Sequence, residues 1–507
     1  MSNYETLNTL EIKVAETNTV FLGLPLIYLM ENAGRSVADV VGEKLGGSVK
    51  GKDIIVFAGK GGNAGDGFVA ARHLASRGAN VKVLLYYPPE SITHGDAKFN
   101  LNLITRLNSI HISAVKDYCE KRLLIGDAFI DALLGIGFSG KNLRNPVKAA
   151  VEQFNEGKAS LKVAIDAPTG VNSDTGETAK PAVKADVTVT MQYMKPGLRK
   201  AVKHTGEVIV AKIGIPREAR VYTGPGDVKH RIPSKPSQAS GGIGGRIAVI
   251  GGSELYTGAP ALSGLAALRT GADLVFIYTG NLSSPIIAGF DPDLIVRSCP
   301  GDRLNPECIE LYRGEWGRAT AIVLGPGLGS NPEAIKAARN IIGLALEKNI
   351  PVVLDADGLE TLANLDMKLS DKFILTPHIG EASLLLGRRV GEDQDSWIQA
   401  ALDIARKYRS IVLLKAPVDV IVNPDGDYRL NRIRHEAMST GGTRNVLTGV
   451  IATLVSMGID PFNAAATAAY ITGRASVLAA ELYGERIMAK DLVHLIPEVF
   501  REAHTKY

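Results

Sequence analysis

Three stretches in the first half of the chain combine glycines with an aspartate close to an apolar run. They are FAGKGGNAGDGFVAARHL from Phe57 to Leu74, DALLGIGFSGK from Asp131 to Lys141 and DAPTGVNSDTG from Asp166 to Gly176. Glycines let backbone N–H groups approach a phosphate closely, and the start of a following helix favours the same anion. The aspartates could bind a cation or exchange a proton. A plain tight turn at the first stretch, and capping of strand ends by Asp131 and Asp166, are the alternatives without chemistry.

A fourth glycine turn, TGGTRNVLTG from Thr440 to Gly449, has the pattern of a phosphate-binding helix start. Gly441 and Gly442 could place backbone N–H groups next to an anion. A phosphoryl-transfer or elimination site needs a small residue and then a carboxylate base at the two positions after Thr443, where this chain has Arg444 and Asn445. An amide cannot accept a proton at neutral pH. The turn therefore has the form of an active site without its base.

Alternating apolar runs and helical stretches predict two α/β domains that position these residues. Strands are expected at residues 53–59, 80–87, 128–137, 161–168, 186–191 and 207–214, and again at 245–252, 272–280, 321–329, 351–358, 373–378 and 410–417. The carboxyl ends of parallel strands share one crevice, where the glycine turns would meet. The stretch from Pro216 to Gly242 is rich in Pro, Gly, Ser and charge and is the expected boundary. The predicted domains are residues 1–220 and 225–507.

Composition excludes several classes of function. A chain of 507 residues with 45% hydrophobic content fits two globular domains. Its 57 basic and 53 acidic residues nearly cancel, and no basic run with interleaved aromatics is present, so we expect no nucleic-acid partner. The longest apolar run, Thr19 to Met30, is too short to span a membrane and contains a proline. Cys119, Cys299 and Cys308 lack metal-like spacing, so we expect reduced, packed cysteines in a cytoplasmic protein.

Five ordered motifs make the first 215 or so residues resemble the YjeF N-terminal domain, the NAD(P)H-hydrate epimerase. They are MENAG (30–34), GNAGDG (62–67), DALLGIG, DAPTGVNSDTG and KADVTVT (184–190). The resemblance implies a Rossmann-like αβα sandwich that interconverts the R and S epimers of the hydrated nicotinamide ring with a bound potassium ion.

By position, the resemblance assigns roles to residues of this crevice. Asn63, Asp131 and Thr169 would bind potassium, and Asp131, Asp166 and Lys195 would be catalytic, with Asp166 at the nicotinamide end. A solvated surface charge is the alternative for Lys195. The residues expected to bind the dinucleotide phosphates and ribose are Gly62, Asn63, Ala64, Gly65, Asp66, Gly135, Ile136, Gly137, Phe138, Ser139, Gly140 and Lys141.

The second half resembles the ribokinase-like NAD(P)H-hydrate dehydratase from about residue 225 to 507, and the fusion resembles the bifunctional NAD(P)H-hydrate repair enzymes. The motifs are GGSELYTGAPALSGLAALRTGADLV (251–275), GPGLG (325–329), DADGL, LTPHIGE (375–381) and LLKAPVDVIV. The resemblance implies a second αβα domain in which ADP or ATP, with magnesium, drives loss of water from the S hydrate.

The roles implied in this half concern substrate and nucleotide. The expected substrate contacts are Ala259, Gly327, His378 and Asn445, and the expected nucleotide contacts are Lys415, Ala416, Pro417, Val418, Asp419 and Arg444. Packing in a loop is the alternative for His378. Asp355 and Asp357 belong to the magnesium or substrate region, with helix capping as the alternative for Asp357.

Departures from the dehydratase pattern cluster around one chemical step. Relatives have Gly-Asp where this chain has Arg444 and Asn445. Just upstream, relatives usually have Thr-Gly-Asn and another glycine before the Met, and residues 433–437 of this chain take their place. SGGIGG at 240–245 lacks a lysine usual before the first strand. We expect impaired dehydration, unless His435 or Glu436 acts as the base. The alternatives are a non-catalytic nucleotide-binding domain and a small-molecule kinase. The expected partners are hydrated NADH or NADPH and ADP or ATP, in a homo-oligomer.

Overall fold

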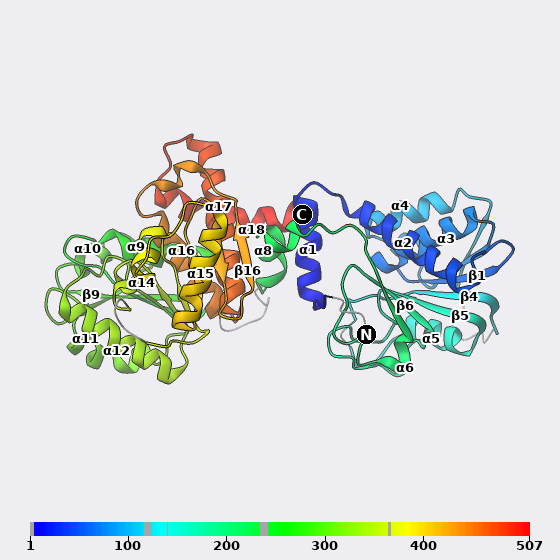
Figure 1. The fold of residues 1–507 in the computed structure, drawn as a ribbon, viewed down its shortest axis with the longest axis horizontal. Coiled ribbons are helices and arrows are strands. Elements are labelled where there is room, and N and C mark those ends of the chain that lie inside the picture. The colour runs from blue at the N-terminus through cyan, green and yellow to red at the C-terminus, as the bar shows by residue number, and fades with distance from the viewer. Residues whose placement is uncertain (1–4, 116–122, 139, 234–241, 363–366) are drawn as a thin grey trace. The chain divides into compact units, whose positions relative to one another are not determined.

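The chain forms two compact α/β units, Met1–Arg217 and Glu218–Tyr507. The computed structural model describes residues 5–115, 123–138, 140–233, 242–362 and 367–507 (Figure 1). The prediction of two α/β domains is confirmed. Residues 218–220, which the sequence assigned to the first domain, lie in the second unit.

The first unit contains a sheet of seven parallel strands in the order β3-β2-β1-β4-β5-β6-β7. The strands are β1 (Asp53–Ala58), β2 (Asn80–Leu85), β3 (Ile110–Ala114), β4 (Ile125–Ala132), β5 (Lys158–Ile165), β6 (Val187–Met191) and β7 (Glu207–Ala211). The helices are α1 (Thr9–Phe21), α2 (Leu26–Lys44), α3 (Gly62–Ser76), α4 (Gly95–Ile104), α5 (Val147–Glu156) and α6 (Val202–Thr205), with a 3-10 turn η1 (Pro89–Ser91).

Helices cover both faces of this sheet, with α2 and α3 on one face and α5 on the other (Figure 1). Successive residues of a strand point to opposite faces, and on the α5 face Phe57 packs edge-on against Phe154 with ring centroids 5.1 Å apart. On the other face α2 and α3 touch closely, because a Cβ on Gly34 would lie 2.4 Å from the Cβ of Val69. The glycine of the MENAG motif therefore brings α2 against the helix that opens the crevice.

The second unit contains a nine-stranded sheet in the order β10-β9-β8-β11-β12-β13-β14-β15-β16. The strands are β8 (Arg246–Ile250), β9 (Leu274–Gly280), β10 (Ile295–Cys299), β11 (Ala321–Leu324), β12 (Val352–Leu354), β13 (Phe373–Leu375), β14 (Ile411–Leu414), β15 (Asp419–Val422) and β16 (Tyr428–Asn431). The pairs β14–β15 and β15–β16 are antiparallel and the others parallel.

Two helical layers enclose the second sheet, one with α11, α12 and α15 and the other with α9, α16, α17 and α18. The helices are α7 (Glu218–Val221), α8 (Pro225–Arg231), α9 (Gly258–Thr270), α10 (Ser284–Ala288), α11 (Pro306–Trp316), α12 (Pro332–Lys348), α13 (Asp357–Glu360), α14 (Ile379–Leu386), α15 (Gln394–Tyr408), α16 (Thr443–Ser456), α17 (Pro461–Tyr483) and α18 (Ala489–Thr505), with a 3-10 turn η2 (Glu436–Ser439). No helix within the described ranges is long and apolar enough to cross a bilayer.

The division between the two units, after Arg217, falls within the stretch predicted as a boundary, but that stretch is structured over residues 218–231. It forms α7 and α8, and Asp227 of α8 is fully buried. Burial by itself would raise the pKa of Asp227, but the charges and hydrogen bonds of Arg429 and Arg231 outweigh it and lower the pKa to about 2. The Nε of Arg231 lies 2.9 Å from the carboxylate and an Nη of Arg429 lies 2.8 Å from it. Charges that suggested an exposed linker thus stabilise the interior of the second unit.

Two of the three cysteines do not fit the expectation of reduced packing residues. Cys299, at the end of β10, forms a disulfide with Cys308 in α11, with Cα atoms 5.0 Å apart. The two residues are nine positions apart in the sequence, and the loop between them brings their side chains together. Their spacing is not typical of metal ligands and did not indicate the pairing. Cys119 lies outside the described residues.

Candidate active sites of the two units

The crevice of the first unit lies where β1, β4 and β5 end side by side. Asp131 of β4 is in register with Phe57 of β1 and with Ala164 of β5. The three glycine stretches follow these strands, so the structure brings them to one edge of the sheet as the parallel pattern predicts. The contact is close, because a Cβ on Gly59 would lie 2.1 Å from the carbonyl oxygen of Leu133.

Asp131 and Thr169 form a buried pair beneath this edge. The Thr169 hydroxyl donates to one oxygen of Asp131 at 2.7 Å, and the Thr169 N–H donates to the other at 2.8 Å. Burial raises the pKa of Asp131 to about 6, although the hydrogen bonds from Thr169 and Leu133 act to lower it. A desolvated carboxyl of this kind gains a strong preference for ionisation once a cation lies beside it.

Asn63 lies against the same edge. Its Oδ1 would be 3.1 Å from a Cβ at Gly135, and its Nδ2 is buried without a hydrogen-bond partner. Side-chain oxygens from Asn63, Asp131 and Thr169 are the hard donors that suit potassium, and the desolvated Asp131 carboxyl fits a bound cation. The unpartnered Asn63 N–H groups suit a hydrogen-bond acceptor such as phosphate instead. The structure therefore offers these three residues together, as the sequence prediction requires.

The glycine stretch after β1 is the first turn of α3 rather than a separate loop. The helix begins at Gly62 with Gly61 as its N-cap, so Asn63, Ala64 and Gly65 lie in the turn whose N–H groups face an anion. Gly65 packs on α2, where a Cβ would lie 2.5 Å from the sulfur of Met30.

Asp166 and Lys195 form a buried ion pair beside this helix. The Lys195 side chain is 1% exposed, and its Nζ donates to Asp166, to the Thr190 hydroxyl at 2.7 Å and to the Met191 carbonyl at 3.0 Å. All three ammonium protons are used, so the surface-charge alternative for Lys195 is wrong. Asp166 has φ 64°, a conformation that costs energy for a residue other than glycine and is concentrated at functional sites.

Three more carboxyl groups, those of Glu16, Asp66 and Asp96, reach the cavity that contains this pair. The cavity holds about 160 Å³ and is lined by Glu16 of α1, Asp66 of α3, Asp166 and Lys195, together with His94 and Asp96. Burial raises the pKa of Glu16 to about 7, and the negative charge of Asp166 adds to this, while Lys195 opposes it. Burial, with Asp166 and Glu16 nearby, also raises the pKa of Asp66 well above its usual value.

The remaining residues predicted for the dinucleotide do not line this cavity. Gly135 contacts Asn63, as above, and Ile136, Gly137, Phe138, Gly140 and Lys141 follow in the loop after β4. Ser139 lies outside the described residues. The loop is at the correct edge of the sheet for phosphate or ribose, and those roles stay predictions.

In the second unit, a cavity of about 960 Å³ opens beside the start of α16. Lys415, Ala416, Pro417 and Asp419 line it from the segment between β14 and β15, and Arg444 lines it from α16. Five of the six predicted nucleotide contacts therefore share one cavity. Val418 does not line it, because its side chain packs against the hydrophobic core.

The charged groups of this cavity are mixed. His378, Arg434 and Glu436 also line it, and the Arg434 guanidinium donates to the Ala416 carbonyl at 2.7 Å. Burial raises the pKa of Asp419, although a hydrogen bond from Asn431 acts to lower it. A cavity of this size with cationic side chains and a helix start at its wall suits a nucleotide.

His378 both caps a helix and faces the cavity. It is the N-cap of α14, and its Nδ1 accepts from the N–H of Gly380 at 2.9 Å. Burial lowers the pKa of His378, and the positive charges of Arg444 and Lys415 lower it further, while Glu381 opposes them. His378 therefore caps α14 at the cavity wall, its Nε2 lies 3.5 Å from the Glu381 carboxylate, and its contact with substrate stays a prediction.

Lys415 is tied to the aspartate predicted for the magnesium region. Its Nζ lies 2.5 Å from Asp355, which also accepts from the Thr376 hydroxyl at 2.7 Å. Asp357 begins α13 and accepts from the N–H of Gly329 at 2.8 Å. Both carboxylates are therefore engaged within the protein, and Asp357 orders the GPGLG loop.

Arg444 and Asn445 occupy different surroundings in the first turn of α16. Arg444 is exposed on the cavity wall, whereas Asn445 is half-buried and does not line the cavity. Its carbonyl accepts from Ser263 of α9 at 3.0 Å. On that side, Gly327 lies against Tyr256 and Ala259, since a Cβ on Gly327 would be 2.8 Å from the Cβ of Tyr256 and 3.3 Å from that of Ala259. The predicted substrate residues Ala259 and Gly327 are thus adjacent.

Comparison with known proteins gives the same division of the chain. A family model described as YjeF-related protein N-terminus matches residues 27–197, and one described as NAD(P)H-hydrate dehydratase matches residues 247–498. A solved structure of an ADP/ATP-dependent NAD(P)H-hydrate dehydratase from Bacillus subtilis, co-crystallised with ATP and Mg²⁺, is 25% identical and covers 56% of this chain and 98% of that one, with a TM-score of 0.48.

Curated relatives match along the whole chain. The bifunctional NAD(P)H-hydrate repair enzyme Nnr of Hyperthermus butylicus is 38% identical over 97% of this chain and 91% of its own length. The protein of the same name from Methanothermobacter thermautotrophicus is 37% identical over 96% of this chain and 94% of its own. With both units matched in order and at this identity, the chain belongs to the family of bifunctional NAD(P)H-hydrate repair enzymes.

Proposed function

We propose that the first unit interconverts the R and S epimers of hydrated NADH and NADPH, and that the second binds ADP or ATP and dehydrates the S epimer slowly. The observation that carries the first half is the meeting of the Asp166–Lys195 pair with Glu16 and Asp66 in one cavity at the carboxyl edge of the sheet. When several carboxyl groups share one cavity and differ in pKa, one can act as a general acid and another as a general base.

The reaction supports separate roles for these carboxyl groups. The epimers differ at the ring carbon that bears the hydroxyl, so its C–O bond must break and form again on the other face. A protonated carboxyl donates its proton so that the hydroxyl leaves as water, and an ionised carboxylate takes a proton from the water that returns. Glu16, with its raised pKa, suits the acid, and Asp166, paired with Lys195, suits the base.

Binding of the dinucleotide is proposed at the start of α3 and the loop after β4. The N–H groups of Gly62 and Asn63, which precede the first bonds of the helix, would hold phosphate, and Asn63, Asp131 and Thr169 would hold potassium. The ion would supply a fixed positive charge beside the bound anion. These residues lie together at the edge where Asp166 enters the cavity.

The second unit is proposed to bind nucleotide in the 960 Å³ cavity through the segment from Lys415 to Asp419. Magnesium would accompany the nucleotide, and the carboxylates of Asp419 and Glu436 are suitable oxygen donors in this cavity. Arg444 and Asn445 leave the first turn of α16 without a base. A nucleotide-binding unit without useful catalysis is the second candidate, and the same two residues favour it.

The proposal includes a cytoplasmic, homo-oligomeric protein. Intracellular proteins of hyperthermophilic archaea do contain disulfides, so the Cys299–Cys308 bond is compatible with that location. Light scattering of the purified chain would measure its oligomeric state, and a monomer would contradict this part.

The test is an assay of the full chain on separated R and S hydrates. Asp166→Asn and Glu16→Gln should each slow epimerisation by about 10²–10⁴, the range for loss of a general acid or base. Glu11→Gln is the matched control, since Glu11 is on the same helix outside the cavity. Lys415→Ala should leave epimerisation unchanged and weaken ADP binding. Equal rates in wild type and Asp166→Asn would overturn the assignment of the first unit.

A further inference from the structure

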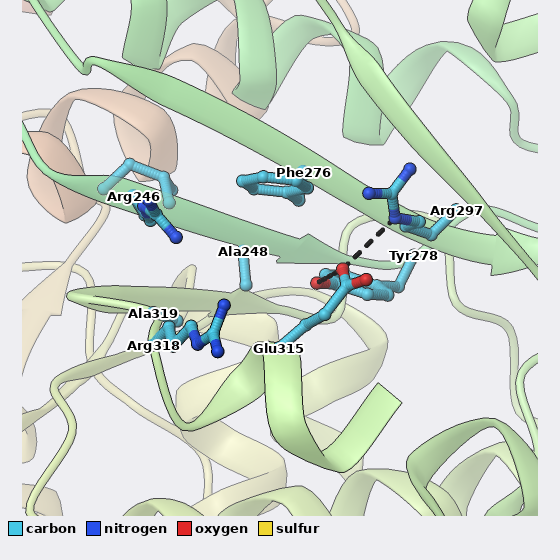
Figure 2. A pocket seen from close by; sticks show the side chains of 9 residues that line it. Arg246, Ala248, Phe276, Tyr278, Arg297, Glu315, Arg318 and Ala319 are labelled. Carbon is cyan, nitrogen blue, oxygen red and sulfur yellow. Dashed lines mark hydrogen bonds and ion pairs between the residues drawn. The ribbon is translucent and has the colours of Figure 1, made fainter. Parts of the chain in front are cut away.

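A second pocket in the C-terminal unit lies on the face of the sheet that α11 covers only in part. The cross-strand register pairs Ala248 of β8 with Phe276 of β9, and Tyr278 with Arg297 of β10, so these side chains share one face. Arg246, two residues before Ala248, lies on that face at the first position of β8. Figure 2 shows these residues around a hollow of about 230 Å³.

The end of α11 explains why the hollow exists. The helix stops at Trp316 with Gly317 as its C-cap, and the chain then turns toward β11. Glu315 and Arg318, on either side of this stop, form the wall opposite the strands. The early residues of β8 and β9 are therefore left without helical cover. The pocket is separate from the nucleotide cavity, which is lined by segments following β13 and β14.

The pocket carries more positive than negative charge. Glu315 is the acidic residue among those that line it, and it is already engaged: Arg297 Nε and the Tyr278 hydroxyl each lie 3.1 Å from the same carboxylate oxygen. Arg246 and Arg318 have no acidic partner within the part of the chain that the structure describes. Figure 2 places these two arginines on one side of Ala248 and the Arg297–Glu315 pair on the other.

The rest of the lining is apolar and partly aromatic. Phe276, Ala248 and Ala319 form it, and the Arg297 guanidinium lies 5.5 Å from the centre of the Phe276 ring. A guanidinium presents a planar fork that fits the oxygens of phosphate, and two forks favour a dianion over a single carboxylate. The volume is too small for a whole dinucleotide and fits a phosphate group with one ring or a short carbon body.

We propose that this pocket binds a compact phosphate monoester, with its dianionic group between Arg246 and Arg318 and its carbon body against Phe276 and Ala248. The Arg297–Glu315 pair closes the other side and leaves two arginine charges for the ligand. Its lining shares no residue with either candidate active site, so we take it as a separate site on the second unit.

The chain carries its own reporter for this site. It has two tryptophans, and Trp316 is buried with its ring centroid 5.2 Å from that of Tyr278, a residue of the pocket wall. Replacing the other one, Trp397→Phe, makes Trp316 the sole emitter. The described residues that line the nucleotide cavity and the epimerase cavity include no tryptophan, so phosphate binding there does not report through this signal.

The experiment is a titration of the full-length Trp397→Phe protein with phenyl phosphate, followed by Trp316 emission. We expect a saturable change in emission. The affinity for phenyl phosphate should fall by at least about tenfold in Arg246→Ala/Arg318→Ala, because two charge-assisted contacts are lost. Arg313→Ala is the control: Arg313 is exposed on the same helix and pairs with Glu310, away from the pocket. It should leave the affinity unchanged, and inorganic phosphate should bind more weakly than phenyl phosphate.

Three results would overturn the proposal. One is the absence of a saturable emission change in a protein whose thermal unfolding matches that of the parent. Another is equal affinity in the Arg246→Ala/Arg318→Ala protein and the Arg313→Ala control. The third is binding of benzoate as tight as that of phenyl phosphate, which would show that the pocket selects a ring and a single charge rather than a phosphate.

Discussion

Exchanging two residues at the start of α16 should restore dehydration to the second unit. In the double variant Arg444→Gly/Asn445→Asp, a carboxylate returns to the first turn and the exposed arginine leaves the cavity wall. Gly442, with φ 89°, turns the chain into the helix immediately before these positions. The Asn445 N–H donates to the Gly442 carbonyl at 3.0 Å, whereas the N–H groups of Thr443 and Arg444 precede this first bond of the helix. Removal of the Arg444 side chain should open these two groups to a phosphoryl group.

The expected gain in the rate of dehydration depends on which features of the active site the two substitutions restore. A general base contributes about 10²–10⁴ in rate. An aspartate in the first turn of a helix is held ionised by the helix dipole and is therefore a weaker base. Arg434 also stays in the cavity, where its guanidinium donates to the Ala416 carbonyl at 2.7 Å. We expect a gain of about tenfold or more, below the full range for a base.

Asn445→Asp alone should restore less. Arg444 is the adjacent residue, and a guanidinium close to a carboxylate lowers its pKa and weakens it as a proton acceptor. The single variant separates the loss of the base from obstruction of the phosphate site. Arg444→Gly alone provides no base, so its rate should stay near that of the natural protein.

The assay follows the absorbance of the reduced nicotinamide as S hydrate is dehydrated by the full chain with ADP and magnesium. Arg486→Gly is a matched control, because Arg486 is exposed outside the cavity. Two results would refute the reasoning. Rapid dehydration by the natural protein, lost in Glu436→Gln, would identify another base. A double variant that binds ADP and remains inactive would show that residues 433–437 had removed more than the base.

Three further predictions concern charge and stability. The pKa of Asp131 is about 6 in the folded state and about 3.9 in the unfolded state, so without potassium the free energy of unfolding should fall as pH rises from about 4 to 6. Potassium should raise the melting temperature increasingly over the same pH range, because the ionised carboxylate binds it. Sodium is the control, and Asp131→Asn should show no such increase. Lys195→Met should lower the free energy of unfolding by about 3–5 kcal/mol in denaturant titration, since it leaves a buried partner unpaired, whereas Lys44→Met on an exposed pair should change it little. In Arg444→Gly, NMR titration should show a higher pKa of His378, because a positive charge that lowers it is gone.

The central strands were predictable because they are short apolar runs bounded by glycine and aspartate. β3, β10, β15 and β16 were not predicted, whereas β7, which also lies at a sheet edge, was expected at residues 207–214. β3 and β10 are partly exposed, and their sequences lack the continuous apolar run that marks a strand buried on both faces. β15 and β16 form an antiparallel addition to the parallel sheet, which an alternation of strands and helices does not indicate. Periodicity therefore missed strands that are partly exposed or antiparallel, and not the sheet edges as such.

Residues of the crevice could be predicted where they belong to a recognisable motif. They could not be predicted where only the packing of the folded chain places them there. Asp131, Thr169 and Asp166 each lie in a recognisable glycine stretch. Glu16 is one of several acidic residues in an N-terminal helix, 150 positions before Asp166, and no spacing links the two. Its place in the cavity depends on how α1 packs, so only the structure could add it to the acid–base set.

The two units differ in how they use charge, and the difference bears on what the second unit does. In the first, the lysine of the cavity is neutralised by Asp166, and carboxyl groups remain to exchange protons. In the second, Lys415 is paired with Asp355, but Arg444 is an added cation at the site where a carboxylate is absent. An arginine there binds a phosphate equally in the ground and transition states, which raises affinity without raising the rate of the chemical step. We therefore expect Arg444 and Asn445 together to favour retention of nucleotide over turnover in the second unit.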